Sequence, residues 1–342
     1  MKKFLRKAAV FALIFGLIAF AVCYYIDPYN VFHPLSIREN AVEPNKNYIK
    51  MKYILSQPDK FDTFIFGSSR VGYLNTQKFT GAKAYNMTYS LAVPQENSDN
   101  LKTMLKNGIV PKSIILEVDD ISYRMDPLSH REDRMRCPYE YLVSHPLTFA
   151  KLYLCPATAL ESLKTSQYGE RNSEIEENFY KYGNTIVYDQ IGEYTPNARF
   201  PMTEPGNIDG AIESIREIAE LCGDNGIDLY VFVSPMHYVT YGAAYERGDY
   251  FDFLRRLAEV VPFYNFSGYN DISLDSSNFI DYSHYSAEIG DRIIDRIWNG
   301  NADEELLKQG FGFYTDKDNI DELLEILSEG NEKYLYLYEE AE

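Results

Sequence analysis

Short apolar segments that alternate with helical patterns constrain this chain most strongly. Five segments have the length and the β-branched or aromatic content of buried strands, and five have helical spacing. The strand segments are Phe61 to Phe66, Lys83 to Met87, Ser113 to Val118, Asp228 to Val233 and Phe263 to Phe266. The helical segments are Tyr48 to Leu55, Gln95 to Asn107, Ile208 to Cys222, Tyr250 to Val260 and Ala287 to Trp298. Such alternation favours right-handed crossovers and a parallel sheet. We therefore predict an α/β fold, a three-layer α/β/α sandwich with a mostly parallel five-stranded sheet.

The same patterns divide the chain into segments. Residues 27–59 read as a linker with one short helix, and residues 60–300 as the α/β domain. Within that domain, residues from about 122 to 205 lose all periodicity, which predicts an insertion of the kind that often shapes a substrate site. Residues 301–342 hold 13 acidic residues against 3 lysines. They predict an acidic helical extension that is mainly a solvated surface, with docking as the alternative.

The N-terminus predicts a membrane segment. Basic residues within positions 1–7 precede an apolar run over 8–26, and about 19 apolar residues can span a hydrocarbon core of roughly 30 Å. The basic flank predicts a cytoplasmic tip and an extracytoplasmic domain, held at the cell membrane by a single pass. A cleaved signal peptide remains the alternative, because Ala19-Phe20-Ala21 has the small-x-small form of a cleavage site.

Charge and cysteine content exclude several classes of function. The formal net charge of −18 argues against a nucleic-acid partner, which needs clustered Lys and Arg. The four cysteines include no CxxC pair, so we expect no zinc site. We also find no glycine-rich phosphate loop and therefore expect no cofactor and no metal. A bridge between Cys137 and Cys155 is left open, since an exported compartment permits it.

A serine follows the first predicted strand. The residues Gly67-Ser68-Ser69-Arg70 stand directly after it, at the edge where parallel sheets bind ligands. A serine on such a turn is presented at the mouth of the sheet, where backbone N–H groups can stabilise an oxyanion. Alone, the pattern is more typical of a turn that caps a helix.

A possible base for this serine lies near the other end of the chain. Asp281 precedes His284 by three positions, in a loop that leads into the last predicted helix. A histidine so placed can take the serine proton while the aspartate orients its ring. The alternative is a helix cap beside a surface histidine. We predict Ser69 as the nucleophile and the Asp281/His284 pair as its base.

These two blocks carry a resemblance to a known family. Gly-Ser-Ser-Arg after the first strand and Asp-x-Ser-His before the last helix resemble the SGNH/GDSL hydrolase superfamily, in its cell-envelope branch. That branch includes alginate O-acetylation proteins and the D-alanyl transfer proteins of teichoic acid synthesis. The likeness covers roughly residues 60 to 300 and implies that Ser69, not Ser68, is the nucleophile.

The resemblance extends to weaker blocks and has two departures. The stretch from Tyr85 to Ala92 is similar to the family's second block, which implies that the turn at Ser90 and Leu91 lends a backbone N–H to the oxyanion hole. Leu91 stands where that block usually has glycine. The usual Gly-x-Asn-Asp third block is replaced by Glu117-Val118-Asp119-Asp120. The oxyanion hole is then expected to depend on backbone donors.

Two further residues are candidates for substrate binding. Arg70 could bind an anionic group or the oxyanion, although a structural ion pair is the alternative. His237 follows the fourth strand and is expected at the same edge of the sheet as Ser69.

The function that these observations predict is acyl chemistry on an exported polymer. We expect a serine-dependent acyl esterase or O-acyltransferase that acts on a cell-surface polysaccharide or envelope polymer of a bacterial cell. An acylated glycan and the membrane are the expected partners, and a membrane-bound O-acyltransferase is a further candidate. The alternative is an inactive SGNH-like subunit that binds glycan or acts as a scaffold beside such an acyltransferase.

Overall fold

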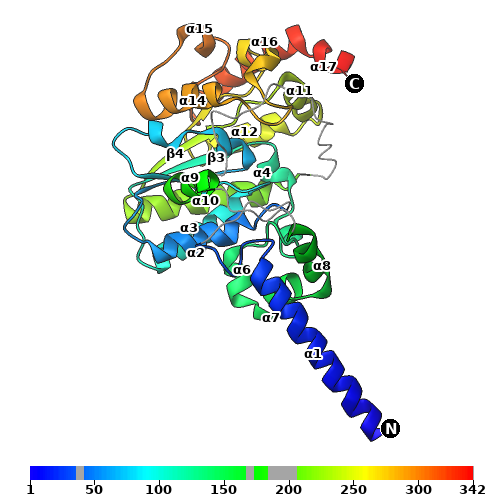
Figure 1. The fold of residues 1–342 in the computed structure, drawn as a ribbon. Helices are drawn as coiled ribbons and strands as arrows, with labels where there is room; N and C mark the ends of the chain where they lie inside the picture. Colours follow the sequence, from blue (N-terminus) through cyan, green and yellow to red (C-terminus); the bar gives the residue numbers. More distant parts are fainter. Residues whose placement is uncertain (36–41, 167–172, 184–205, 342) are drawn as a thin grey trace. The chain divides into compact units, whose positions relative to one another are not determined.

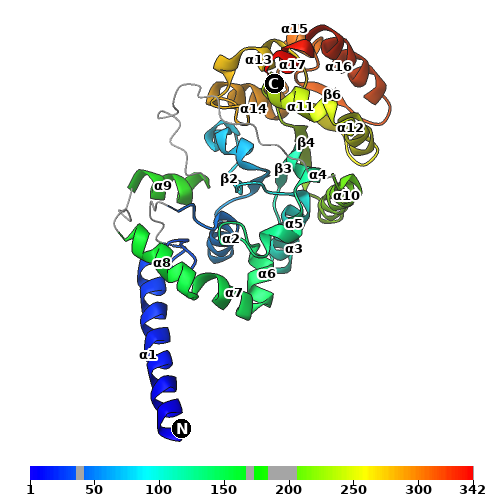
Figure 2. The same ribbon diagram turned by 90° about the vertical axis from the view of Figure 1, so that its right-hand side faces the viewer.

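The chain forms two compact units. The computed structural model describes residues 1–35, 42–166, 173–183 and 206–341 (Figures 1 and 2). The N-terminal unit combines Met1–Gln57 with Leu128–Tyr180, and the sheet unit combines Pro58–Pro127 with Lys181–Glu342. The end of the predicted insertion, residues 184–205, lies outside the described residues.

The sheet unit confirms an α/β architecture with a mostly parallel sheet. Its strands follow the order β2-β1-β3-β4-β5-β6, and every neighbouring pair is parallel except β5 and β6. The bounds are β1 Thr63–Phe66, β2 Ala84–Asn86, β3 Ser113–Val118, β4 Asp228–Val233, β5 Phe263–Asn265 and β6 Phe313–Thr315. The central strands β1 and β3 are buried along their whole length, which explains their continuous apolar composition.

The prediction of five strands is wrong by one. The sixth strand, β6, pairs antiparallel with β5 and lies inside the segment read as a helical extension. The helix that follows it, α16 (Ile320–Tyr334), buries Leu323, Leu324 and Leu327. This strand has only three residues and lies in a highly charged segment. Neither its length nor an alternating pattern distinguishes it from a loop in the sequence.

The helices of the sheet unit alternate with its strands along the chain, as in an α/β protein. The longer ones are α3 (Pro94–Lys106), α10 (Ile208–Asn225), α11 (Tyr238–Glu246), α12 (Tyr250–Ala258), α14 (Ala287–Asn299) and α16. Shorter ones are η1 (Ser69–Tyr73), η2 (Thr76–Lys78), α4 (Ile121–Arg124), α13 (Asp271–Leu274), η4 (Ser276–Asn278), α15 (Glu304–Leu307) and α17 (Tyr336–Ala341).

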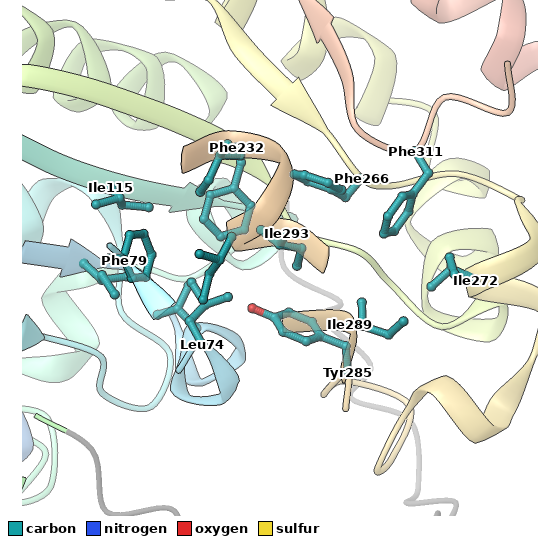
Figure 3. Packing of buried hydrophobic residues seen from close by; sticks show 14 of the residues in the cluster. Leu74, Phe79, Ile115, Phe232, Phe266, Ile272, Tyr285, Ile289, Ile293 and Phe311 are labelled. Carbon is teal, nitrogen blue, oxygen red and sulfur yellow. The ribbon is translucent and has the colours of Figure 1, made fainter. Parts of the chain in front are cut away.

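The main apolar core of the sheet unit joins the strands to α14. Ile115 and Phe232 from the sheet meet Ile289 and Ile293 from α14, with Leu74 beside them (Figure 3). Apolar residues spaced three and four positions apart on α14 form one apolar side of the helix, and this side packs against the core. His284 lies in the loop directly before α14, and Ser69 lies in the turn directly after β1. The core therefore fixes the position of the His284 loop relative to the Ser69 turn.

The N-terminal unit consists of helices. They are α1 (Lys2–Ile26), α2 (Lys46–Ser56), α6 (Tyr139–Ser144), α7 (Pro146–Tyr153) and α8 (Pro156–Thr165). Two more, α5 (Pro127–His130) and α9 (Ser173–Tyr182), contain the residues at which the chain passes between the units. Helix α1 is long and apolar enough to cross a membrane. All four cysteines are free thiols, so the bridge left open between Cys137 and Cys155 is not formed.

Helix α1 ends in a compact turn. Asp27 adopts the left-handed conformation at its C-terminus, with φ 48°. The Asp27 carboxylate then accepts hydrogen bonds from the N–H groups of Val31, Phe32 and His33, at 2.7 to 2.9 Å. Aspartate suits this position because it tolerates the left-handed region and its side chain satisfies nearby backbone donors.

One glycine permits the close approach of α14 to the serine turn. A Cβ atom at Gly290 would lie 2.5 Å from the carbonyl oxygen of Tyr73, the last residue of η1. Real Cβ atoms do not approach backbone oxygen so closely, so any side chain here forces α14 away from η1. By contrast, Gly223 lies in the exposed part of α10 with no atom near the position of a Cβ.

We predict opposite effects for alanine at these two helical glycines. Gly290→Ala should lower the free energy of unfolding by about 1 to 3 kcal/mol, because it overpacks the contact with Tyr73. Gly223→Ala should raise it by about 0.5 to 1 kcal/mol, because alanine is the better helix former. Urea unfolding of both variants tests this. Equal effects of the two substitutions would contradict the close approach.

Candidate active site

The serine turn is built against a buried glutamate of the neighbouring strand. Gly67 follows β1, and a Cβ atom there would lie 2.6 Å from Oε2 of Glu117 on β3. Only glycine allows this contact. The N–H of Ser68 donates to the same Glu117 oxygen at 2.8 Å, and the Ser68 side chain caps η1. Ser69, the first residue of η1, is thereby presented at the carboxyl edge of the sheet.

The histidine loop is a tight turn organised by Asp281. The Oδ1 atom of Asp281 accepts the backbone N–H of Ser283 at 2.7 Å and that of His284 at 2.8 Å. A bridge between Phe279 and Tyr285 closes the base of the loop. The aspartate thus shapes the backbone that carries the histidine, in addition to contacting its ring.

Ser69, His284 and Asp281 form one continuous line of contacts. Ser69 Oγ lies 2.8 Å from Nε2 of His284. The other ring nitrogen, Nδ1, lies 2.9 Å from Oδ2 and 3.0 Å from Oδ1 of Asp281. Because a carboxylate only accepts, a neutral ring carries its proton on Nδ1, which leaves Nε2 to accept the proton of Ser69. Ser69 and His284 are 215 positions apart along the chain, yet with Asp281 they meet in the arrangement of a nucleophile, a base and an orienting acid.

Asp281 is held in its ionised form. Burial opposes ionisation, but hydrogen bonds from the His284 ring and from the N–H groups of Ser283 and His284 outweigh it and lower the pKa of Asp281 below its ordinary value. The side chains of Asp281 and His284 are 15% and 23% exposed. The site is therefore partly shielded from water but still open to a substrate.

Arg70 does not reach into the open site. It is 2% exposed, and its guanidinium makes ion pairs with Asp119 and Asp120. Its Nε donates to the carbonyl oxygen of Ser283 at 3.0 Å. This is the structural ion pair that the sequence left open as an alternative to substrate binding. Arg70 joins the serine turn, the end of β3 and the histidine loop.

The pKa of Arg70 reflects these neighbours. Burial disfavours the cation, but the carboxylates of Asp119, Asp120 and Glu117 overcome it and raise the pKa of Arg70 above its ordinary value. Burial and the nearby Asp119 raise the pKa of Glu117 well above its ordinary value. Glu117 therefore favours the neutral acid, and Asp119 and Asp120 are the ion-pair partners of the arginine.

Sequence reasoning missed the role of these acids. Glu117, Asp119 and Asp120 were recognised only as a departure from a family block. The sequence did contain a signal for this role, because it places three carboxylates at the end of a buried strand. Buried carboxylates require a cation nearby. Asp119 also accepts from the hydroxyl of Ser68 at 3.1 Å. The acids thus support the serine turn from beneath.

The turn after β2 lies beside the serine turn. Thr88 donates its hydroxyl proton to the carbonyl oxygen of Ser68 at 2.5 Å, which joins the two turns. Leu91 adopts the left-handed conformation with φ 60°, a region that favours glycine and costs other residues roughly 1 to 2 kcal/mol. No residue within the described ranges accepts a hydrogen bond from the N–H of Ser69 or Leu91. Ser90, beside Leu91, is half-buried.

His237 supports the histidine loop from behind. It is fully buried, and its Nε2 lies 2.9 Å from the hydroxyl of Ser276. Its ring packs against Phe279 and Tyr282, on either side of Asp281. Its Nδ1 accepts the N–H of Val239 at the start of α11. Its surroundings therefore differ from the open substrate contact that the sequence predicts.

No protein-family model matches the chain, and no curated protein matches it. Among the described residues, no group of three or more His, Cys, Asp or Glu side chains is placed to hold a metal ion.

We predict that Arg70 contributes far more to stability than a surface arginine. Arg70→Met leaves Asp119 and Asp120 buried without a cation and should lower the free energy of unfolding by about 3 to 5 kcal/mol at pH 7. The matched control is Arg255→Met, because Arg255 pairs with Asp321 at the surface, with side chains 53% and 82% exposed. The control should cost less than about 1 kcal/mol. Similar costs for the two variants would show that the buried network is unimportant.

His237 predicts acid sensitivity. Burial lowers its pKa from 6.5 to about 4, against a smaller opposing effect of Asp281. Between these two pKa values His237 binds a proton in the unfolded chain but not in the folded chain. The free energy of unfolding therefore decreases as pH falls from about 6.5 toward 4. His237→Gln cannot titrate. Between pH 7 and pH 4.5 the parent should lose about 2 to 3 kcal/mol more than this variant in urea unfolding. Parallel pH profiles would contradict the assignment.

Proposed function

We propose that this chain is a serine-dependent acyl esterase or O-acyltransferase in which Ser69 forms an acyl-enzyme. The contact of 2.8 Å between Ser69 Oγ and His284 Nε2, with Asp281 on the far side of the ring, carries the proposal. The orientation of each ring nitrogen supports it, because only Nε2 faces the serine. A surface histidine beside a capped helix would need neither contact.

The proposed reaction has two steps. Ser69 Oγ attacks an ester or thioester carbonyl while His284 Nε2 takes the serine proton, and Asp281 stabilises the imidazolium that forms. The tetrahedral intermediate collapses, the leaving oxygen or sulfur takes the proton from His284, and the acyl group stays on Ser69. In the second step a hydroxyl group of a sugar, or water, loses its proton to His284 and attacks the acyl-enzyme. The bond between the acyl group and Ser69 Oγ then breaks, and His284 returns the proton to Ser69. Transfer and hydrolysis differ only in this acceptor.

Backbone donors complete the proposed site. The N–H groups of Ser69 and Leu91 lie on two turns that Thr88 joins, and both have no acceptor among the described residues. The left-handed Leu91 supports this role, because a strained backbone persists where function requires it. A side-chain donor from a third family block is missing, and one lost donor can cost roughly 10²- to 10³-fold in rate. We expect a modest turnover.

The proposed setting is the outer face of a bacterial cell membrane. We propose that the sheet unit is a three-layer sandwich of the SGNH type and that α1 crosses the membrane with its basic tip in the cytoplasm. An enzyme anchored in this way lies where envelope polymers are assembled. We therefore propose an acylated polysaccharide or envelope polymer as substrate, with a membrane-bound O-acyltransferase as a candidate source of acyl groups.

A serine-directed probe tests the proposal. A fluorophosphonate should label the purified full-length chain, and peptide mass spectrometry should find the adduct on Ser69. Ser69→Ala should abolish labelling. His284→Gln and Asp281→Asn should slow it by about 10²-fold or more, because both remove the activation of the serine.

Ser277→Ala is the matched control, because Ser277 is an exposed serine of η4 outside this site. It should label at the parent rate. Labelling that persists in Ser69→Ala, or no labelling of any folded variant, would sink the proposal. The second outcome would favour a glycan-binding or scaffold role in which the acyl chemistry belongs to a partner.

A further inference from the structure

Helix α8 of the N-terminal unit has an inverted pattern of burial. Its polar residues Thr158, Ser162 and Thr165 are 1%, 0% and 0% exposed. Its leucines at 160 and 163 are 61% and 56% exposed. A helix on a protein surrounded by water does the opposite, as α10 does when it buries its isoleucines. Small polar residues inside and leucines outside are typical of a helix that faces lipid.

The buried side of α8 packs against the end of α1. The two helices contact each other, and Cys23 of α1 lies within hydrogen-bonding reach of Ser162. Only the last two turns of α1 are covered: Cys23 is buried, Ala19, Val22 and Ile26 are half-buried, and the residues before Ala19 are exposed. The small side chains of α8 permit this close packing, as they do between helices within membranes.

This contact gives the depth of α8 relative to the apolar run. The run from Ala8 to Ile26 is roughly 28 Å long as a helix, so all of it is needed to span a hydrocarbon core of roughly 30 Å. The turns that touch α8 are then the outermost ones. Helix α8 consequently lies within about 10 Å of the outer surface of the hydrocarbon, the depth at which amphipathic helices lie in the interface.

Neighbouring features fit the same location. Tyr24 and Tyr25 lie in the last turn of α1, which ends at Ile26, and aromatic residues collect where a membrane meets water. Leu147, on α7 just before α8, is 85% exposed. In both ribbon views α7 and α8 lie beside the end of α1 (Figures 1 and 2). The two charges within α8, Glu161 and Lys164, pair with each other at 3.1 Å, which suits an interfacial helix rather than a spanning one.

We propose that α7 and α8 lie in the outer interfacial layer of the bilayer that α1 spans, with Leu147, Leu160 and Leu163 against the acyl chains. Lipid is the occupant because the exposed leucines continue the apolar surface of α1 at the same depth. The proposal rests on α1 spanning the membrane and is independent of the chemistry at Ser69.

Quenching by brominated lipid tests this in the full-length chain. Trp298 is the single tryptophan, so Trp298→Phe provides a silent background, checked for folding by circular dichroism. Leu160→Trp and Leu163→Trp are introduced separately, and the protein is placed in phosphatidylcholine vesicles with ordinary or brominated acyl chains. Emission of both should be about twofold lower in the brominated vesicles, because an interfacial apolar face reaches the upper acyl chains.

Two controls bracket the result. Phe15→Trp, in the middle of α1, should be quenched. Val110→Trp, a position of the sheet unit that is 56% exposed, should not be. Quenching at Phe15→Trp without quenching at Leu160→Trp and Leu163→Trp would overturn the proposal. A blue-shifted but unquenched emission at 160 would assign this face to a second copy or a protein partner instead. Absence of quenching at Phe15→Trp would remove the premise and the proposal with it.

Discussion

The buried ion pair of Arg70 with Asp119 and Asp120 is the interaction on which the candidate site depends. Arg70 follows Ser69 in the chain, its carboxylate partners end β3, and its Nε reaches the backbone of the histidine loop at Ser283. Three segments distant in sequence are thus held by one guanidinium that stays charged at any physiological pH. Because two carboxylates cannot stay buried without a cation, a displacement of Arg70 costs several kcal/mol. The distance between Ser69 and His284 is therefore constrained before any substrate binds.

Much of the fold and the three residues of the candidate site could be predicted from the sequence because they depend on local patterns. Strands β3 and β4 have the predicted bounds, since continuous apolar runs between turns leave little choice. Ser69 and the Asp281/His284 pair were identifiable because parallel strands bring their carboxyl ends to one edge of the sheet. The structure brings these three residues into contact at that edge.

Other features depend on contacts between distant segments, which one sequence does not reveal. The strand β6 is visible only through its pairing with β5. Arg70 and His237 both lie at the predicted edge of the sheet, yet both are buried. Arg70 pairs with Asp119 and Asp120. The ring of His237 packs against Phe279 and Tyr282. A residue's position after a strand predicts the edge of the sheet at which the residue lies, but not whether its side chain is buried or exposed. The burial of the polar side of α8 likewise cannot be predicted from its sequence alone, because it depends on the contact with α1.

A rapid-quench measurement tests most directly whether Ser69 accepts an acyl group from an ester, as we propose. The full-length chain is mixed with an activated acetyl ester, quenched with acid at successive times, and analysed by intact and peptide mass spectrometry. We expect a chain heavier by one acetyl group, with the group on Ser69, at times before a second turnover. A chain that stays unmodified while ester is consumed, or an acetyl group on any other residue, would contradict it.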